Sequence, residues 1–148
     1  MRRGRTYNSA IAAVQKFASK SHVALLRASK GRFGGRVLGG PVLVLITTGR
    51  RSGERRETPL LYVEDGNSFA VIASNGGTAS HPAWFLNLMS RPDAEVRVGD
   101  RTFPVRAEEA SGEERRRIWD LAVEMYPTYE DYQGRTDREI PVVALRRI

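Results

Sequence analysis

Six short runs of apolar and β-branched residues constrain the fold of this chain more than any other feature. They cover residues 41–48, 60–63, 69–73, 95–98, 102–106 and 140–145. Each run has the length and composition of a β-strand. The first is almost continuously apolar, which is typical of a strand buried on both faces. Asp65-Gly66 and Gly99-Asp100 separate two pairs of runs, and such dipeptides are typical of hairpin turns. The pattern therefore predicts a mostly antiparallel sheet.

Three further segments predict helices. Residues 8–29 and 82–90 carry apolar residues at helical spacing, and a third such segment follows Ser111. This third helix is expected to begin with a capping box formed by Ser111 and Glu114 and to end before Pro127. Strands joined by hairpins, with helices between them, favour an α+β domain around a small barrel. We expect an N-terminal helix and two further helices around it.

A glycine-rich stretch over residues 31–40 divides the chain into two parts. We expect a basic amphipathic helix and connector over residues 1–40 and the barrel domain over residues 41–148. Residues 1–36 hold nine basic residues and no acidic one, whereas the rest of the chain holds 15 basic and 17 acidic residues. Such an asymmetry is typical of a protein with an anionic partner.

The basic arm, residues 1–36, admits more than one role. An amphipathic basic helix can lie on an anionic membrane surface, or it can simply pack on its own domain. The arm lacks interleaved aromatic residues and a recognition motif, so no nucleic-acid partner is expected. A non-enzymatic module that binds nucleic acid or membrane is nevertheless kept as an alternative. The oligomeric state stays open.

Several classes of site are excluded by composition. The chain contains no cysteine and no run of 18 apolar residues, which argues against disulfides, thiolate chemistry and a membrane-spanning helix. With only His22 and His81, a multi-histidine zinc site is not expected. We expect a cytoplasmic protein, peripheral on the inner face of the cell membrane if the basic arm binds there.

The segment Arg50-Arg51-Ser52-Gly53-Glu54-Arg55-Arg56, here called the basic loop, joins two predicted strands. Glycine lets the backbone turn tightly, and exposed N–H groups with arginine forks suit phosphate or carboxylate groups. Its spacing matches neither a Walker loop nor a dinucleotide-binding motif. The pattern leaves two interpretations open: an anion site, or a solvated loop.

Two other segments could border a flat ligand. Residues 73–77 end a strand and include a glycine pair that permits close approach of the backbone. Trp84 and Phe85 follow, and they could offer stacking surface or pack in the core. Three tyrosines over residues 126–132 are spaced by three, so they could line a pocket or pack at the end of a helix.

Taken together, these segments resemble the deazaflavin (F420)-dependent nitroreductase family. The likeness runs from about Val42 to the C-terminus. It is carried by residues 47–60, by Ser74 with the Gly76-Gly77 pair, by residues 81–88 and 126–132, and by residues 136–138 and 140–143. One piece alone would be weak evidence, but their order and spacing together are specific.

The resemblance implies a split β-barrel of the FMN-binding type, with coenzyme F420 in a groove and its anionic tail on the basic loop. It implies a reductase that passes a hydride from C5 of reduced F420 to a quinone, a nitroaromatic or an activated enone. An FMN-binding oxidoreductase on the same fold is the alternative. FMN has a single phosphate and no glutamate tail, so it would need fewer arginines than this loop offers.

The resemblance also assigns residues. It implies that the coenzyme is held by Arg50, Arg51, Ser52, Gly53, Glu54, Arg55, Arg56, Pro59, Ile72, Ala73, Ser74, Asn75, Ala83, Trp84, Phe85, Leu86, Asn87, Tyr126 and Tyr129. It implies catalytic positions at Ser74, Tyr126, Tyr129 and Tyr132, with Ser74 or a tyrosine positioning a proton. Leu61 and Asn75 stand where relatives that reduce bicyclic nitroimidazoles carry tyrosines, so we do not expect reduction of such drugs.

Overall fold

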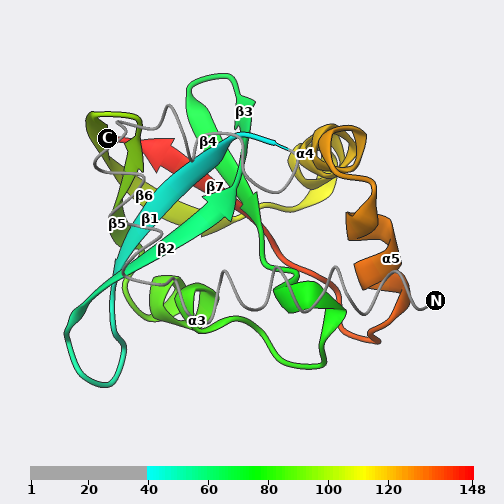
Figure 1. Ribbon diagram of the computed structural model, residues 1–148, viewed down its shortest axis with the longest axis horizontal. Helices are drawn as coiled ribbons and strands as arrows, with labels where there is room; N and C mark the ends of the chain where they lie inside the picture. Colours follow the sequence, from blue (N-terminus) through cyan, green and yellow to red (C-terminus); the bar gives the residue numbers. More distant parts are fainter. Residues whose placement is uncertain (1–39) are drawn as a thin grey trace.

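The computed structural model describes residues 40–148, which form seven strands, three α-helices and one short 3₁₀ helix (Figure 1). In chain order they are β1 (Val42–Thr48), β2 (Arg55–Leu61), β3 (Val63–Asp65), β4 (Ser68–Ile72), η2 (Asn75–Gly77), α3 (Ala83–Ser90), β5 (Asp93–Val98), β6 (Arg101–Glu109), α4 (Gly112–Met125), α5 (Thr128–Gly134) and β7 (Val142–Arg147). The predicted helix over residues 8–29 and most of the connector lie outside the described residues.

All seven strands belong to one antiparallel sheet, in the order β2-β1-β5-β6-β7-β4-β3. The sheet curls, because β2 and β4 touch although four strands separate them in this order. The predicted α+β class and mostly antiparallel pairing are therefore confirmed. The prediction of two helices after the N-terminal one is wrong, since the described part of the chain has three.

Strand β1 lies between two layers of core, as its continuous apolar sequence predicts. Leu43 and Leu45 pack with Trp84 of α3 on one face. Val44 and Ile46 belong to the other cluster, which contains the tyrosines of residues 126–132. Because neighbouring side chains on a strand point to opposite faces, one strand supports both the α3 layer and the tyrosine layer.

Two predicted boundaries differ from the structure. Strand β2 begins at Arg55, so the last two arginines of the basic loop already pair with β1. The predicted strand over residues 60–63 is divided, because Tyr62 lies between β2 and β3. The hairpin turn at Asp65-Gly66 is confirmed, with Gly66 in the left-handed conformation that this turn requires.

The predicted capping box at the start of α4 is wrong. Ser111 occupies the N-cap position but makes no side-chain hydrogen bond there. Glu114 instead accepts two hydrogen bonds from Arg146 of β7, at 2.9 and 3.0 Å. The bidentate pair with Arg146 gives the carboxylate two charge-assisted bonds where the capping box would give one, which explains why it turns toward the sheet.

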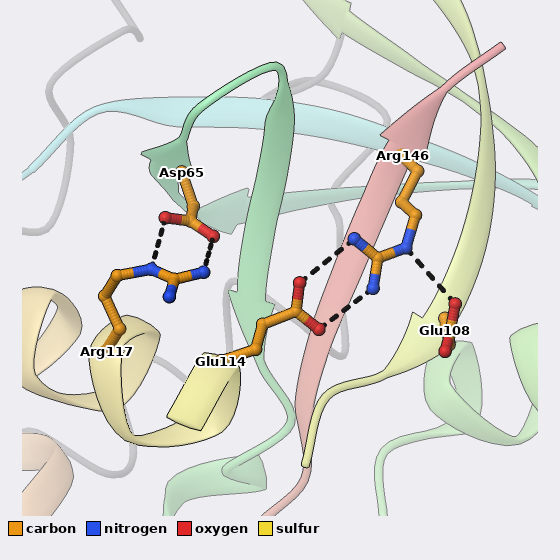
Figure 2. A network of polar contacts seen from close by, with 5 residues as sticks. All are labelled: Asp65, Glu108, Glu114, Arg117 and Arg146. Atoms are coloured by element: carbon orange, nitrogen blue, oxygen red, sulfur yellow. Dashed lines mark hydrogen bonds and ion pairs between the residues drawn. The ribbon is translucent and has the colours of Figure 1, made fainter. Parts of the chain in front are cut away.

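Two arginines anchor α4 to the sheet (Figure 2). Arg117 of α4 binds both carboxylate oxygens of Asp65 in β3 at 2.8 Å. Arg146 of β7 bridges Glu114 of α4 and Glu108 of β6, the latter at 3.2 Å. These contacts fix the helix that leads directly into the tyrosine segment.

The Asp65–Arg117 pair should make stability depend on pH. Hydrogen bonds from Arg117 lower the pKa of the Asp65 carboxyl, against the opposing effect of its burial. A lowered pKa in the folded state contributes stability above the unfolded value of about 3.9 and loses it as the pH falls through the folded value. We expect Asp65→Asn to destabilise the protein by about 0.5–1 kcal/mol at pH 7, and by progressively less below about pH 4.

Thermal unfolding of both proteins at pH 7 and pH 3 measures this dependence. Asp120→Asn is the matched control, because Asp120 is exposed on the same helix α4 and has no hydrogen-bond or ion-pair partner among residues 40–148. A difference between wild type and Asp65→Asn that stayed the same at both pH values would contradict the prediction.

Candidate active site

The residues expected to bind coenzyme and substrate lie in one row along the sheet. Figure 1 shows this row from the turn joining β1 and β2, past α3 and η2, to α5. The backbone N–H of Arg50 donates to the Asn87 Oδ1 of α3 at 3.1 Å, which ties the first two elements together. Helix α5 packs against η2 at the other end. Segments far apart in the sequence thus form one continuous rim.

The structure distributes the predicted residues over one turn and five helices or strands. Arg50, Arg51, Ser52, Gly53 and Glu54 form the turn; Arg55, Arg56 and Pro59 lie on β2; Ile72 ends β4; Ala73 and Ser74 lead into η2 at Asn75; Ala83, Trp84, Phe85, Leu86 and Asn87 belong to α3; and Tyr126 precedes α5, which carries Tyr129 and Tyr132.

The turn at the start of the basic loop is compact. Gly49 N–H donates to the Glu54 carbonyl at 2.7 Å, and Gly53 N–H donates to the Gly49 carbonyl at 2.8 Å. A Cβ at position 49 would lie 2.7 Å from the Ser52 hydroxyl, so a larger residue there would have to displace that side chain. Backbone hydrogen bonds therefore fix the loop before any ligand binds.

The basic loop carries an exposed positive charge. Its four arginines and one glutamate give 4 − 1 = +3, and all seven residues are exposed. Arg56 approaches Glu54 at 3.4 Å, and Arg55 approaches Glu57 at 3.2 Å. Arg51 has no hydrogen-bond or ion-pair partner among residues 40–148. The loop can therefore bind an anion without first breaking a bond to Arg51.

The α3 helix turns its aromatic residues inward. Trp84 and Phe85 are 4% and 5% exposed and belong to the core with Leu43 and Leu45. The core interpretation thus holds for both rings, and neither presents an open stacking surface. Asn87 is buried as well, and its Oδ1 also accepts a bond from the Arg50 guanidinium at 3.4 Å. Its observed role is to hold the basic loop.

The η2 segment has an uncommon backbone. Asn75 is the one non-glycine residue among those described with a left-handed backbone, at φ 47°. The Asn75 side chain donates to the Ser80 carbonyl at 3.1 Å, which stabilises this conformation locally. Gly77 packs so closely on α5 that an added Cβ would lie 2.8 Å from the Tyr132 carbonyl oxygen. Loop and helix are therefore in direct backbone contact.

Three tyrosines form a closed cluster at the end of the rim. Tyr126, Tyr129 and Tyr132 are 5%, 5% and 0% exposed. The Tyr126 and Tyr132 hydroxyl oxygens lie 3.3 Å apart, and the Tyr126 and Tyr129 rings meet edge to face at 5.1 Å between centroids. Tyr129 and Tyr132 lie on α5, whereas Tyr126 precedes the helix.

Burial keeps the hydroxyls of Tyr129 and Tyr132 protonated. It raises the pKa of Tyr129, and the nearby Tyr126 adds to the effect. Burial also raises the pKa of Tyr132, reinforced by the hydrogen bond to Tyr126. A protonated phenol can donate a hydrogen bond or a proton, so near neutral pH these residues can act as donors and not as phenolate bases.

Residues 18–147 match the family described as F420H(2)-dependent quinone reductase. The chain belongs to this family. Members of the F420H2-dependent quinone reductase family are oxidoreductases, so the chain is an F420H2-dependent enzyme. The match covers nearly all of the predicted rim, from the basic loop to the tyrosines.

Individual relatives agree with the assignment to the F420H2-dependent quinone reductase family. An F420H(2)-dependent quinone reductase of Mycobacterium tuberculosis is 39% identical over 130 residues, which cover 85% of this chain and 87% of the relative. A solved structure of an F420-H2 dependent reductase, FDR-A, is 44% identical at a TM-score of 0.67, over 72% of this chain and 94% of the other.

More distant solved structures are similar to this chain in fold only. A heme binding protein from Mycobacterium smegmatis aligns at a TM-score of 0.57 with 17% identity, over 82% of this chain and 51% of the other. The curled antiparallel sheet is thus the split barrel that the resemblance implied. No helix among residues 40–148 is long and apolar enough to cross a membrane.

The described residues fit the coenzyme of the F420H2-dependent quinone reductases at both ends of the rim. The exposed charge of +3 and the unpaired Arg51 suit an anionic tail. At η2, no acceptor among residues 40–148 is in range of the Ser74 and Asn75 backbone N–H groups. Ser74 is in the right-handed and Asn75 in the left-handed conformation, a combination that turns successive N–H groups to one side.

Sequence reasoning missed Arg138. The Thr136-Asp137-Arg138 segment contributed to the family resemblance but received no role. In the structure its guanidinium contacts His81 and the residues on both sides of η2, which lie 57 to 65 positions earlier in the chain. Short-range patterns carry no signal for a contact over this separation.

Proposed function

We propose that this enzyme transfers a hydride from reduced F420 to a quinone, with the coenzyme's tail on the basic loop and its ring along residues 72–75. The observation that carries the proposal is the rim itself. It joins an exposed cationic loop, a segment with two backbone N–H groups that lack an acceptor among residues 40–148, and a buried cluster of tyrosines. Nitroaromatics and activated enones are further acceptors that we propose on chemical grounds, since each accepts a hydride.

The charges around the basic loop favour one side for the tail. A hollow of about 400 Å³ beside the loop is lined by Arg55 but also by Asp93 and Glu95, whose carboxylates would repel an anion. Neighbouring residues on a strand point to opposite faces, so Arg56 lies on the other side of β2. We therefore propose that the tail lies on the face of Arg51 and Arg56.

The protein's part in the reaction is to orient and to supply a proton. When bound, the coenzyme supplies the hydride. The basic loop would bind the tail, and the backbone of residues 73–75 would hold the ring. We propose that the Tyr132 hydroxyl, kept protonated by burial, and the Tyr126 hydroxyl 3.3 Å from it donate to an acceptor oxygen as negative charge develops on it. The tyrosine cluster also excludes water from this end of the rim.

Titration of the purified protein with F420 and, in parallel, with FMN tests the proposal. Both can be followed by fluorescence at moderate salt concentration. We expect F420 to bind much more tightly, because its tail adds carboxylates to a single phosphate and the loop offers four arginines. Tighter binding of FMN would leave the fold standing but would overturn the proposed coenzyme role of the basic loop.

Replacement of Tyr126 by phenylalanine should separate turnover from binding. The ring and its packing remain, but the hydroxyl 3.3 Å from that of Tyr132 is removed. We expect kcat with a quinone to fall by about 10²-fold, the lower end of a typical contribution from a positioned proton donor, while F420 affinity stays within about twofold. Steady-state kinetics and fluorescence titration measure the two effects, and equal loss of both would contradict the role.

We also propose that the basic arm holds the enzyme at an anionic membrane surface, where lipid-soluble quinones are found. The nine positive charges of residues 1–36 support this, because each basic residue near such a surface contributes about 1 kcal/mol. Co-sedimentation with anionic liposomes tests the proposal. Full-length protein that stays in the supernatant at low salt concentration would rule it out.

A further inference from the structure

The Arg138 guanidinium holds four groups of the η2 region together. Its Nε donates to the Thr78 carbonyl at 2.9 Å, and its Nη2 donates to the Ser74 carbonyl at 2.6 Å. Its Nη1 contacts the Ala73 carbonyl at 3.2 Å and the His81 Nδ1 at 3.0 Å. An arginine has no acceptor, so in the last contact the histidine ring accepts through Nδ1. One side chain therefore ties both ends of residues 73–81.

The backbones of Ser74 and Asn75 are bonded through their carbonyl groups. The Ser74 carbonyl accepts from Arg138 at 2.6 Å and from the Gly77 N–H at 2.9 Å, and the Asn75 carbonyl accepts from the Thr78 N–H at 3.3 Å. The backbone N–H groups of Ser74 and Asn75 have no acceptor among residues 40–148. They form the polar edge against which we place the ring of the coenzyme.

Arg138 is itself fixed to α5. The Gln133 Nε2 of α5 donates to the Arg138 carbonyl at 2.8 Å, and the Gln133 Oε1 accepts from the Ile140 N–H at 2.9 Å. Gly77 of η2 in turn packs on the backbone of Tyr132 in the same helix. The chain of contacts closes on itself, from α5 through Arg138 to η2 and back to α5.

We propose that Arg138 is a positioning residue for the coenzyme ring, which it serves by fixing η2 on α5 before the coenzyme binds. The inference rests on the proposed function, since it requires residues 72–75 to border the deazaflavin. A loop that is ordered only part of the time binds the coenzyme more weakly, because the apparent dissociation constant rises as the ordered fraction falls. Removing the guanidinium should therefore weaken ring binding without touching the tail.

The experiment compares Arg138→Met and Arg138→Lys with wild type in two measurements. The first is amide hydrogen exchange of the protein without coenzyme over residues 73–81. The second is the dissociation constant for F420 and for a deazaflavin truncated before its phosphate. Arg115→Met is the matched control: Arg115 also donates to a backbone carbonyl, that of Ile140 at 2.8 Å, but does not touch η2.

We expect Arg138→Met to speed exchange over residues 73–81 and to weaken both ligands by the same factor, about 10-fold or more. Arg138→Lys should fall between it and wild type, because an ammonium keeps the charge but cannot reach four acceptors. If the Met variant fails to fold, the Lys variant makes the same comparison. Arg115→Met should change neither measurement.

The outcomes separate the two proposals. If wild type binds both ligands and the Arg138 variants bind them equally tightly, the role of Arg138 is overturned and the proposed function stands. If only F420 affinity falls, Arg138 acts on the tail and the inference is wrong. If wild type binds neither ligand, both the proposed function and this inference are wrong.

Discussion

Gly77→Ala should be among the most damaging single-methyl changes in this protein. Gly77 has φ +78°, and an added Cβ would lie 2.8 Å from the carbonyl oxygen and 2.9 Å from the Cα of Tyr132. A left-handed backbone costs a non-glycine residue about 1–2 kcal/mol. Overpacking against a neighbour costs about 1–3 kcal/mol more. We therefore expect a loss of about 2–5 kcal/mol, measured as the free energy of unfolding in urea.

Gly66→Ala separates the two contributions. Gly66 has φ +58°, but nothing lies within 4 Å of the Cβ that the change would add. Gly66→Ala should therefore lower the free energy of unfolding only by the cost of the left-handed backbone, about 1–2 kcal/mol. Equal losses in the two variants would show that contact between η2 and α5 contributes nothing to stability. That result would also weaken the argument that Arg138 and α5 together support the loop.

Coenzyme affinity should collapse when two arginines of the basic loop are removed together. In Arg51→Ala/Arg56→Ala, the face of the loop on which we place the tail loses two of its charges. A hydrogen bond to a charged group contributes about 1.5–3 kcal/mol, and solvent reduces this at exposed positions. We expect F420 to bind about 10²–10³-fold more weakly, measured by fluorescence titration.

The matched control for the loop variant is Arg91→Ala/Arg116→Ala. It removes the same charge from exposed positions outside the rim. It should change F420 affinity by less than about threefold, because screening suppresses the effect of distant charges. The truncated deazaflavin should bind the loop variant as it binds wild type. An equal loss for both ligands would place the loop near the ring and contradict the assignment of the tail.

The features that were predicted correctly from the sequence depend on short-range patterns. A continuous apolar run makes β1 buried on both faces, and Asp65-Gly66 makes a tight turn whatever surrounds it. The order of family motifs from Thr47 onward indicated the family, and the match over residues 18–147 confirms it.

The features that it did not predict depend on the surroundings. Strand β2 begins with Arg55-Arg56-Glu57, which shows no apolar pattern, because an edge strand pairs through its backbone whatever its side chains. The capping-box prediction was wrong because Glu114 pairs with Arg146, which comes near it only when the sheet has formed. Trp84 and Phe85 were compatible with stacking as well as with core packing, and only the folded structure shows that both rings are buried.

The place of β7 in the sheet has a consequence for how the enzyme is made. Strand β7 is the last strand along the chain, yet it lies between β6 and β4 and pairs with both. Until synthesis has passed residue 147, the β3–β4 hairpin and the sheet of β2, β1, β5 and β6 each keep an open edge. A nascent chain with two open edges is prone to wrong pairing and aggregation. The growing polypeptide should therefore depend on shielding at the ribosome until its final strand emerges and joins the two halves.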